Sequence, residues 1–299
     1  MLTHLFVPPR PPARVVILGA NGFVPRALHA RLERDAIPTL TLGSVELDLL
    51  DAGSVTKLTA SLRADDVLVF TAALTPEKGR DLGTFMKNMR MAEHVIAALA
   101  ARPCAHVLYF SSDAVYDPRV EDVNETSPTA PADLYGAMHL ARELALRQAA
   151  AAVKIPFGVL RPCAIYGSGD THNGYGPNRF TRSALAEKKI KLFGGGEEIR
   201  DHVFIDDVVA FTTQAIAHRS TGTINLVSGE PVSFAEVASQ ISRLTGGAVA
   251  VENQPRANAI VHRRFDPAAL RRAFPAVKPT PLSEGLARAV GELRAASSR

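Results

Sequence analysis

A glycine-rich turn near the start of the chain could bind a pyrophosphate. Gly19 and Gly22 follow the β-branched run at residues 15–18 and precede a stretch with helical spacing. Gly19 permits a tight turn, and Gly22 lets the backbone amides of a helix N-terminus approach a phosphate. Pro25 stands where such turns usually carry a third glycine, and proline is tolerated in the first turn of a helix. An ordinary strand–helix turn could use the same residues.

The sequence leaves the choice of dinucleotide open. An acidic residue about 20 positions after the glycines binds the ribose of NAD, whereas an arginine accommodates the extra phosphate of NADP. Residues 42–44, Leu-Gly-Ser, supply neither. Asp48, followed by Leu49, could place a carboxylate on the adenine amino group, or could lie in a solvated acidic loop.

Hydroxyl groups follow a later apolar run at residues 107–110. Ser111 and Ser112 come directly after it, where the carboxyl ends of strands bind ligands in open α/β sheets. Tyr135 and His139 are four positions apart in a helical stretch, so they share one helix face. A phenol in such a place can exchange a proton with an alcohol.

An alternation of strands and helices would position these groups. The predicted strands cover residues 15–18, 39–42, 67–70, 107–110 and 157–160, and the predicted helices cover 27–34, 55–62, 88–101 and 135–152. This order predicts βαβ units. We expect an α/β fold with a Rossmann-type, doubly wound parallel sheet over residues 14–167.

The amino-acid composition of the sequence changes after Gly167. Residues 168–178 are rich in Gly, Asp, Asn and His, as in a surface loop, and the later elements are shorter. We expect a smaller C-terminal α/β substrate domain over 168–299, with segments near 201–228 returning to the first domain. Residues 1–13 should form a proline-rich N-terminal extension that is at most partly ordered.

Together these motifs resemble the extended short-chain dehydrogenase/reductase family, in its nucleotide-sugar NAD-dependent epimerase/dehydratase branch. The matching pieces are the Gly19 turn and the segments 71–73, 109–116, 135–139, 161–167 and 194–201. Their order and spacing over residues 14–290 carry the resemblance, since no single motif is decisive.

The resemblance implies roles for the residues at matching positions. Tyr135 would be the general acid/base and Ser112 would hydrogen-bond the reacting sugar oxygen, while a hydride moves to or from a nicotinamide. The implied cofactor-binding residues are Gly19, Asn21, Gly22, Phe23, Val24, Asp48, Leu49, Thr71, Ala72, Ala73, Asn88, Ser111, Tyr135, His139, Pro162 and Ala164. The implied substrate-binding residues are Asp113, Asn178, Arg179, Phe180, Leu192, Phe193, Arg200 and Arg256.

The implied substrate residues also have plainer interpretations. Arg200 and Arg256 would clamp a diphosphate through their forked donors, but either could form a surface salt bridge. Leu192 and Phe193 would pack against the base, although Phe193 could equally be a core residue.

His139 departs from the family pattern Tyr-x-x-x-Lys. A lysine would carry a permanent positive charge that lowers the pKa of the tyrosine from about 10, whereas a free histidine has a pKa near 6.5. We expect His139 to contact the nicotinamide ribose with a shorter reach. If its protonated form assists Tyr135, activity should be low and confined to a narrow pH range.

Composition excludes several other classes of protein. The 299 residues are 46% apolar with a net charge of +4, which does not suit a disordered chain. The sequence shows no apolar run of membrane-spanning length, no secretory signal and two cysteines, so we expect a cytoplasmic protein without membrane partners. Scattered basic residues argue against a nucleic-acid partner, and the histidines and cysteines form no metal-binding motif.

We therefore expect an NAD(P)-dependent enzyme acting on a nucleotide-diphosphate sugar, as a C4 epimerase or a 4-keto reductase. A 4,6-dehydratase is less expected, because Ala114 follows Asp113 where that branch has a second acid. A dinucleotide-binding regulatory or scaffold protein with weak or lost catalysis is the alternative, supported by Pro25 and His139. The resemblance also implies a homodimer, formed through the helices over 88–101 and 135–152.

Overall fold

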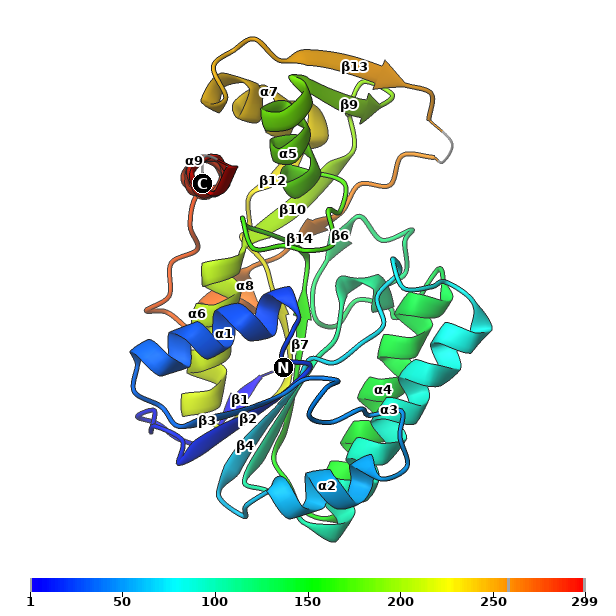
Figure 1. Ribbon diagram of the computed structural model, residues 1–299, viewed down its shortest axis with the longest axis vertical. Helices are drawn as coiled ribbons and strands as arrows, with labels where there is room; N and C mark the ends of the chain where they lie inside the picture. The colour runs from blue at the N-terminus through cyan, green and yellow to red at the C-terminus, as the bar shows by residue number, and fades with distance from the viewer. Residues whose placement is uncertain (1, 257–258, 298–299) are drawn as a thin grey trace.

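A seven-stranded sheet organises the larger of two lobes (Figure 1). The computed structural model describes residues 2–256 and 259–297. In spatial order the strands are β1 (Thr3–His4), β11 (Ser220–Leu226), β7 (Phe157–Pro162), β5 (His106–Phe110), β4 (Asp66–Phe70), β2 (Arg14–Leu18) and β3 (Thr39–Leu42). All neighbouring pairs are parallel except β1 with β11. The central strands are buried along their length, which explains their unbroken apolar runs.

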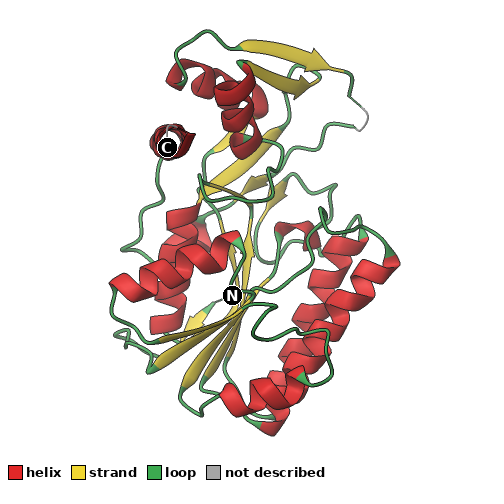
Figure 2. Ribbon diagram, viewed as in Figure 1, coloured by secondary structure: helices red, strands yellow, loops and turns green. Residues whose placement is uncertain are grey.

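Helices cover both faces of this sheet (Figure 2). On one face α1 (Phe23–Arg34) packs against α6 (Ile205–Ala217). On the other face α3 (Leu82–Ala101) packs between α2 (Ser54–Ser61) and α4 (Leu134–Ala152). Each face has its own buried apolar cluster. The predicted doubly wound α/β fold is confirmed.

The smaller lobe is built from later parts of the chain. It contains α5 (Pro177–Glu187), α7 (Phe234–Leu244) and α9 (Leu282–Ser297), together with the pair β9 (Lys189–Phe193) and β13 (Ala250–Gln254). A sheet of β12 (Pro231–Ser233), β10 (Ile199–Phe204) and β8 (Ala164–Tyr166) lies between the lobes, beside the short pair β14 (Arg264–Phe265) and β6 (Asp122–Val123).

The chain crosses between the lobes more than once. After the smaller lobe begins, α6 and β11 join the larger lobe, and so does α8 (Ala268–Ala273), which packs against β11. The predicted boundary near Gly167 can therefore mark only the first of these crossings, and it stays a prediction.

The proline-rich beginning of the chain contributes to the sheet. Thr3 and His4 pair with Thr221 and Ser220, and the His4 ring stacks on that of His218 with centroids 4.2 Å apart. We expected these residues to be at most partly ordered outside the domain, and for β1 that expectation is wrong. Prolines exclude a helix there, but not a two-residue strand at a sheet edge.

The strand order reverses at β2, which places the candidate site. The chain continues from β2 to β3 on one side and then crosses to β4 on the other, and such a switch leaves a crevice at the carboxyl ends of the strands. The Gly19 turn and the segments 71–73 and 111–113 all follow strands that end at this crevice.

Candidate active site

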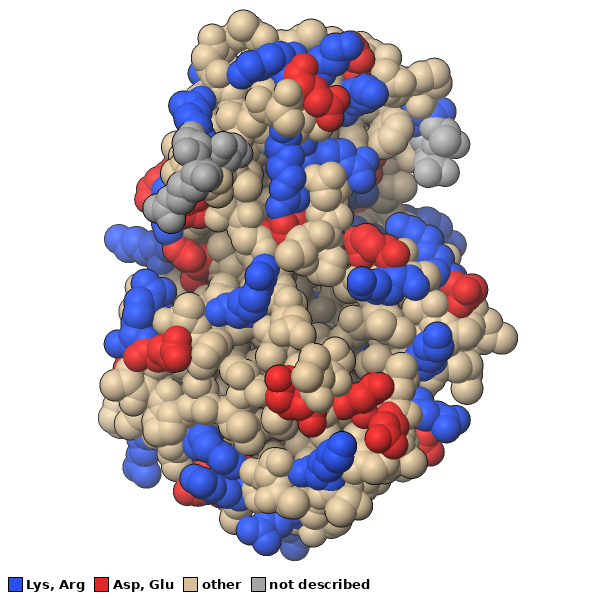
Figure 3. Space-filling model, in the orientation of Figure 1, with Lys and Arg blue, Asp and Glu red and all other residues tan. Residues whose placement is uncertain are grey.

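A cavity of about 760 Å³ opens between the two lobes at the carboxyl ends of the sheet. In the space-filling view the molecule is hollowed here, and basic and acidic side chains are scattered over the face around it (Figure 3). Eighteen of the predicted site residues line this cavity: Gly19, Asn21, Gly22, Phe23, Val24, Asp48, Leu49, Thr71, Ala72, Ala73, Ser111, Ser112, Asp113, Tyr135, His139, Pro162, Ala164 and Asn178. Residues far apart in the sequence thus share one site.

The glycine turn is shaped for close approach of backbone. Gly19 has φ +96°, and a Cβ there would lie 2.8 Å from the Cα of Ala72, so only glycine fits. Gly22 is the N-cap of α1 and provides no side-chain cap, which leaves the first amides of the helix free for a phosphate. Pro25 is the third residue of the helix, where no intrahelical hydrogen bond is lost.

Asn88 supports the cavity wall from behind. Its Oδ1 accepts from the Leu74 amide at 2.8 Å and its Nδ2 donates to the Leu74 carbonyl at 3.0 Å. It is buried and is not among the described residues that line the main cavity. Asn88 therefore shapes the 71–74 loop instead of facing a ligand there.

Ser112 and Tyr135 meet where α4 approaches the loop after β5. Ser112 caps a short 3₁₀ helix, Asp113–Val115, and its hydroxyl lies near enough to the Tyr135 phenol to favour the ionised form of that phenol. Asp133 caps α4 by accepting from the Gly136 amide at 2.9 Å. A Cβ on Gly136 would lie 2.2 Å from the Ala114 carbonyl oxygen, so this glycine lets the helix come close enough for the pair to form. Sequence reasoning overlooked Gly136, although a glycine directly after Tyr135 was a visible signal.

Burial has the largest effect on the pKa values of Tyr135 and Asp113, which both line the cavity. It raises the pKa of Tyr135 to about 12, against the opposing effect of the nearby Ser112 hydroxyl. Burial also raises the pKa of Asp113, and the charges of Arg263 and Arg200 partly offset that effect. Tyr135 is thus a neutral phenol at pH 7 before any ligand binds.

His139 is neutral as well, which corrects one expectation. Burial and the neighbouring charge of Arg142 lower its pKa to about 3, so it carries no positive charge near neutrality. Its Nδ1 is 2.7 Å from the Tyr109 hydroxyl, and its ring meets that of Tyr135 edge-on at 4.7 Å between centroids. The predicted narrow pH range, which needs a protonated His139, is therefore wrong for this geometry.

Among the implied substrate residues, Asn178 lines the cavity, but its side-chain amide is used in hydrogen bonds within the fold. Its Oδ1 accepts from the Gly167 amide at 3.0 Å, and its Nδ2 donates to Asp170 at 2.8 Å. It fixes the 167–178 loop over the cavity.

The other implied substrate residues are not found in the described lining. They are Arg179, Phe180, Leu192, Phe193, Arg200 and Arg256. Phe180 and Leu192 are buried in the core of the smaller lobe, whereas Phe193 is 46% exposed. Arg200 pairs with Glu198 and the Val261 carbonyl, and Arg256 bonds to Glu197 at 2.7 Å and to Glu198 at 3.3 Å. Either arginine would have to release its carboxylate to bind a diphosphate.

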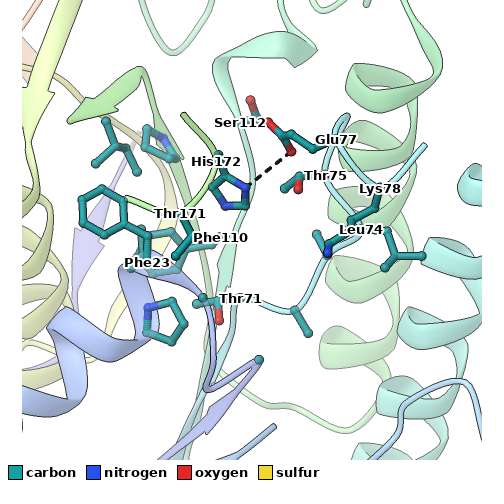
Figure 4. A pocket seen from close by; sticks show the side chains of 18 of the residues that line it. Phe23, Thr71, Leu74, Thr75, Glu77, Lys78, Phe110, Ser112, Thr171 and His172 are labelled. Atoms are coloured by element: carbon teal, nitrogen blue, oxygen red, sulfur yellow. Dashed lines mark ion pairs between the residues drawn. The ribbon is translucent and has the colours of Figure 1, made fainter. Parts of the chain in front are cut away.

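Three further residues were missed by the sequence analysis. Glu77 and His172 point toward one another across the cavity and form an ion pair at 3.4 Å (Figure 4). They come from loops of opposite lobes, so no local sequence pattern indicated their contact. His202 also lines the cavity, and neither of its ring nitrogens has a partner among the described residues.

The described residues give two negative findings. In the part of the chain that the structure describes, no helix is both long and apolar enough to span a membrane. Within the same residues, no three or more His, Cys, Asp or Glu side chains are grouped as a metal would require.

Known proteins share both the sequence pattern and the fold of this chain. The model of the NAD-dependent epimerase/dehydratase family matches residues 15–227. A UDP-glucose 4-epimerase of Mycolicibacterium smegmatis is 27% identical over 93% of this chain and 97% of its own. A crystal structure of a putative epimerase from Burkholderia cenocepacia is 27% identical, with TM-score 0.82 over 96% of this chain and 99% of its own. Thermus thermophilus UDP-glucose 4-epimerase, solved with NAD, shares the fold at 20% identity, with TM-score 0.84 over 95% of this chain and 99% of its own. This chain therefore belongs to the NAD-dependent epimerase/dehydratase family.

Proposed function

We propose that the protein interconverts a nucleotide sugar by reversible oxidation of a sugar hydroxyl, with Tyr135 as the general acid/base. The observation that carries this proposal is that Ser112 and Tyr135 line the same cavity as the Gly19 turn. NAD, when bound at that turn, would supply the hydride acceptor and donor. Ser112 would orient the sugar oxygen, and Tyr135 would take its proton as the hydride leaves.

We favour a C4 epimerase over a 4-keto reductase as the specific reaction. In the epimerase, Tyr135 would return its proton to the same oxygen when the hydride comes back, so protons and electrons balance over a cycle. A reductase would instead take a hydride from NADH and a proton from Tyr135 onto a ketone and release NAD. An epimerase needs room for the sugar to present its other face, and the cavity of about 760 Å³ between the lobes supports this. The named activity of the Mycolicibacterium relative also supports it.

We propose NAD as the preferred cofactor because of Glu46. Its carboxylate accepts from the Gly43 amide at 2.9 Å, just after β3, in the region where an acidic residue binds the adenosine ribose. It would repel the additional phosphate of NADP. The sequence analysis did not single out Glu46, because it expected the acidic residue within positions 42–44. In the structure the turn brings the Glu46 side chain back to Gly43.

The test is product formation by the purified protein. UDP-glucose, UDP-galactose and their N-acetylated forms would each be incubated with and without added NAD, and the sugars separated by chromatography. We expect one C4 pair to approach the same equilibrium mixture from both sides. Tyr135→Phe should abolish the reaction while retaining NAD binding, measured by calorimetry. Formation of a 4-keto product only, or reduction of one in the presence of NADH, would identify the reductase.

The high pKa of Tyr135 favours a second candidate, a dinucleotide-binding protein with weak or lost catalysis. A neutral phenol beside a neutral His139 is a poor base. Binding of NAD without conversion of any nucleotide sugar, in wild type and in His139→Lys alike, would support this candidate and contradict the enzyme.

We also propose a cytoplasmic homodimer. Four of the large apolar side chains that the structure shows exposed, Leu82, Met86, Leu134 and Leu144, lie on the adjacent helices α3 and α4. Exposed apolar side chains gathered on two neighbouring helices are typical of a partner surface.

A further inference from the structure

Glu143 is a buried carboxylate that the proposed mechanism does not use. It lies on α4, eight residues after Tyr135. Its Oε1 accepts from the Ser111 hydroxyl at 2.5 Å and from Arg161 Nε at 2.9 Å, and its Oε2 accepts from Arg161 Nη2 at 2.6 Å. Both partners are buried as well. One carboxylate therefore joins α4 to the carboxyl ends of two neighbouring strands, β5 and β7.

The strand side of this cluster is held in the sheet. The Arg161 guanidinium lies over the Tyr116 ring, 4.9 Å from its centroid, and the Tyr116 hydroxyl donates to Asn225 Oδ1 at 2.7 Å. Asn225 belongs to β11, the neighbour of β7. The Ser111 amide donates to the Leu160 carbonyl of β7 at 2.8 Å. The ends of three adjacent strands are thus linked to one another, and Glu143 connects α4 to that fixed group.

Stability alone does not account for a buried ion pair of this kind. Glu143 and Arg161 lose their hydration on burial, and well-packed apolar side chains of similar volume are often at least as stabilising. What the pair supplies beyond an apolar contact is direction, because the forked guanidinium meets the two carboxylate oxygens through parallel hydrogen bonds. The cluster is therefore suited to fixing the orientation of a helix.

A second close contact lies on the same face of α4. Gly136 and Glu143 are seven residues apart, which is about two helical turns or about 10 Å along the axis. At Gly136 the helix abuts the Ala114 carbonyl, which limits how closely it can approach. At Glu143 the hydrogen bonds hold it against the strand ends. A helix held at one point could pivot, whereas two contacts two turns apart fix its angle.

Both members of the proposed catalytic pair are adjacent to this cluster or to the Gly136 contact. Tyr135 directly precedes Gly136, and Ser112 directly follows Ser111. The Tyr135 hydroxyl stands at the end of a long side chain, so a small tilt of α4 about Gly136 would change its separation from Ser112.

We propose that Glu143 is a positioning residue for Ser112 and Tyr135. Its carboxylate binds Ser111 and Arg161 and thereby holds α4 at the angle at which the catalytic pair meets. The Ser111 hydroxyl then serves Glu143 and not the cofactor, in contrast to the role that the resemblance implied. The inference rests on the proposed function for its kinetic test, whereas its structural test requires no turnover.

Ser111→Ala tests this role while leaving the buried ion pair in place. Crystal structures of wild type and variant, grown under the same conditions, would compare the distance between the Tyr135 and Ser112 hydroxyls. We expect this distance to increase in Ser111→Ala, because one of the bonds that hold α4 is lost. Ser111→Thr keeps a hydroxyl for Glu143 and should retain the distance. An unchanged distance in Ser111→Ala would overturn the inference.

Kinetics of the same variants separate positioning from binding. Misplaced reacting groups slow the chemical step more than they weaken binding, so Ser111→Ala should lower kcat about tenfold, with KM and the calorimetric NAD affinity within about twofold of wild type. Ser111→Thr should stay within about threefold in kcat. An NAD affinity about tenfold weaker in Ser111→Ala, with kcat unchanged, would make Ser111 a cofactor ligand and overturn the inference.

Ser168→Ala is the matched control. The Ser168 hydroxyl donates to Glu292 on α9 at 2.5 Å, the same pair of groups at the same distance, and Ser168 is not in the described cavity lining. This variant should keep both kcat and the distance between the Tyr135 and Ser112 hydroxyls. An equal loss of kcat in Ser168→Ala and Ser111→Ala would show a general effect of losing such a bond and would contradict a role specific to Glu143.

Glu143→Gln extends the test to the ion pair. Its amide can still accept from Ser111, but it turns N–H groups toward Arg161, so the loss of kcat should be larger than in Ser111→Ala. If this variant does not fold, Ser111→Ala still decides the question. A wider hydroxyl distance in Ser111→Ala, with no sugar conversion by wild type, would retain this inference and lose the proposed function. Sugar conversion with full kcat in Ser111→Ala would do the reverse.

Discussion

Burial raises the pKa of the Tyr135 phenol, and this raised pKa sets the expected pH dependence of the reaction rate. Its pKa of about 12 and the pKa of about 3 for His139 lie outside the range in which enzymes are usually assayed. The fraction of phenolate rises about tenfold per pH unit below the pKa of Tyr135. We therefore expect the oxidation step to accelerate steadily from pH 6 to 9.5, without an acid limb from His139.

His139→Lys is the matched variant for that pH profile. A lysine ammonium beside Tyr135 should lower the pKa of the phenol and raise turnover at pH 7, so that the rate becomes less dependent on pH. The measurement is kcat/KM against pH for both proteins. A wild-type profile with an acid limb near pH 6.5 would show that His139 titrates despite its burial.

Glu46 should control cofactor preference. Replacing its carboxylate in Glu46→Gln removes the repulsion of the NADP phosphate, so the ratio of NADP to NAD affinity should rise about tenfold, or about 1.4 kcal/mol. Asp51→Asn is the control, because Asp51 accepts similarly from the Gly53 amide at 3.0 Å, but Gly53, unlike Gly43, is not in the described cavity lining. Equal ratios in wild type and Glu46→Gln would remove Glu46 from the proposal.

For single residues, the sequence predicted which side chains share the cavity better than it predicted which hydrogen bonds and ion pairs they form. Gly19, Ser112 and Tyr135 line one cavity, as their places after strands and on a helix indicated. The link from His139 to Tyr109 spans 30 positions and two elements, and no local pattern encodes it. The pairing of Arg200 with Glu198 was one of two interpretations left open, because an arginine near an acid can turn to either a ligand or its neighbour.

Helix α4 can lie close to the Ala114 carbonyl because Gly136 has no side chain. In Gly136→Ala the new methyl group would collide with the Ala114 carbonyl and push the helix start outward. Tyr135 would separate from Ser112, so we expect at least a hundredfold lower kcat with NAD affinity little changed. Kinetics and calorimetry together would show this split.

Gly291→Ala on α9 is the control for that change. A Cβ there meets nothing within 4 Å, and alanine should stabilise the helix by roughly 1 kcal/mol. If Gly136→Ala kept full activity, the close approach of α4 would not be what holds the catalytic pair.

Helices α3 and α4 should form the dimer surface. Leu144 is 62% exposed on α4, and Leu144→Glu would place a charge in the proposed interface. We expect this variant to elute as a monomer in size-exclusion chromatography with light scattering, whereas wild type elutes as a dimer. Val251→Glu, on β13 of the smaller lobe and 48% exposed, should remain dimeric. A monomeric wild type would refute the proposed dimer.

Helices and strands with a clear hydrophobic pattern were predictable from the sequence, whereas elements without such a pattern were not. Strands β2, β4, β5 and β7 each contain a buried apolar run, and each of these runs was expected. A strand of two residues such as β1 has no periodicity to detect, because its partner on β11 is supplied by the fold.

The whole molecule should lose stability in mild acid because it buries neutral histidines. Burial lowers the pKa of His106 to about 4 and those of His139 and His202 to about 3. The unfolded chain takes up these protons near pH 6.5 and the folded chain does not, so stability present above pH 6.5 falls as pH decreases toward the folded pKa values. Each histidine contributes about 1.4 kcal/mol per pH unit in that window.

Thermal unfolding between pH 7 and 5 measures this slope. His202→Phe removes one of the three groups, and its ring can pack on Phe234 as the histidine does, so the fall in Tm should be about a third smaller. The half-exposed His29 provides the control, His29→Gln, with the wild-type slope expected. The lowered pKa of Asp117, about 2, acts only at more acidic pH. A Tm that stays constant from pH 7 to 5 would contradict the burial of these rings as neutral bases.

The short strand β1 has a practical consequence for handling the protein. It occupies the outer edge of β11, whose backbone groups would otherwise be open to another chain. Trimming residues 2–13 as a supposed loose tail would uncover that edge, together with Phe274, on which the His4 ring packs. A preparation shortened in this way should self-associate and precipitate on storage, and affinity tags are better joined at the other end of the chain.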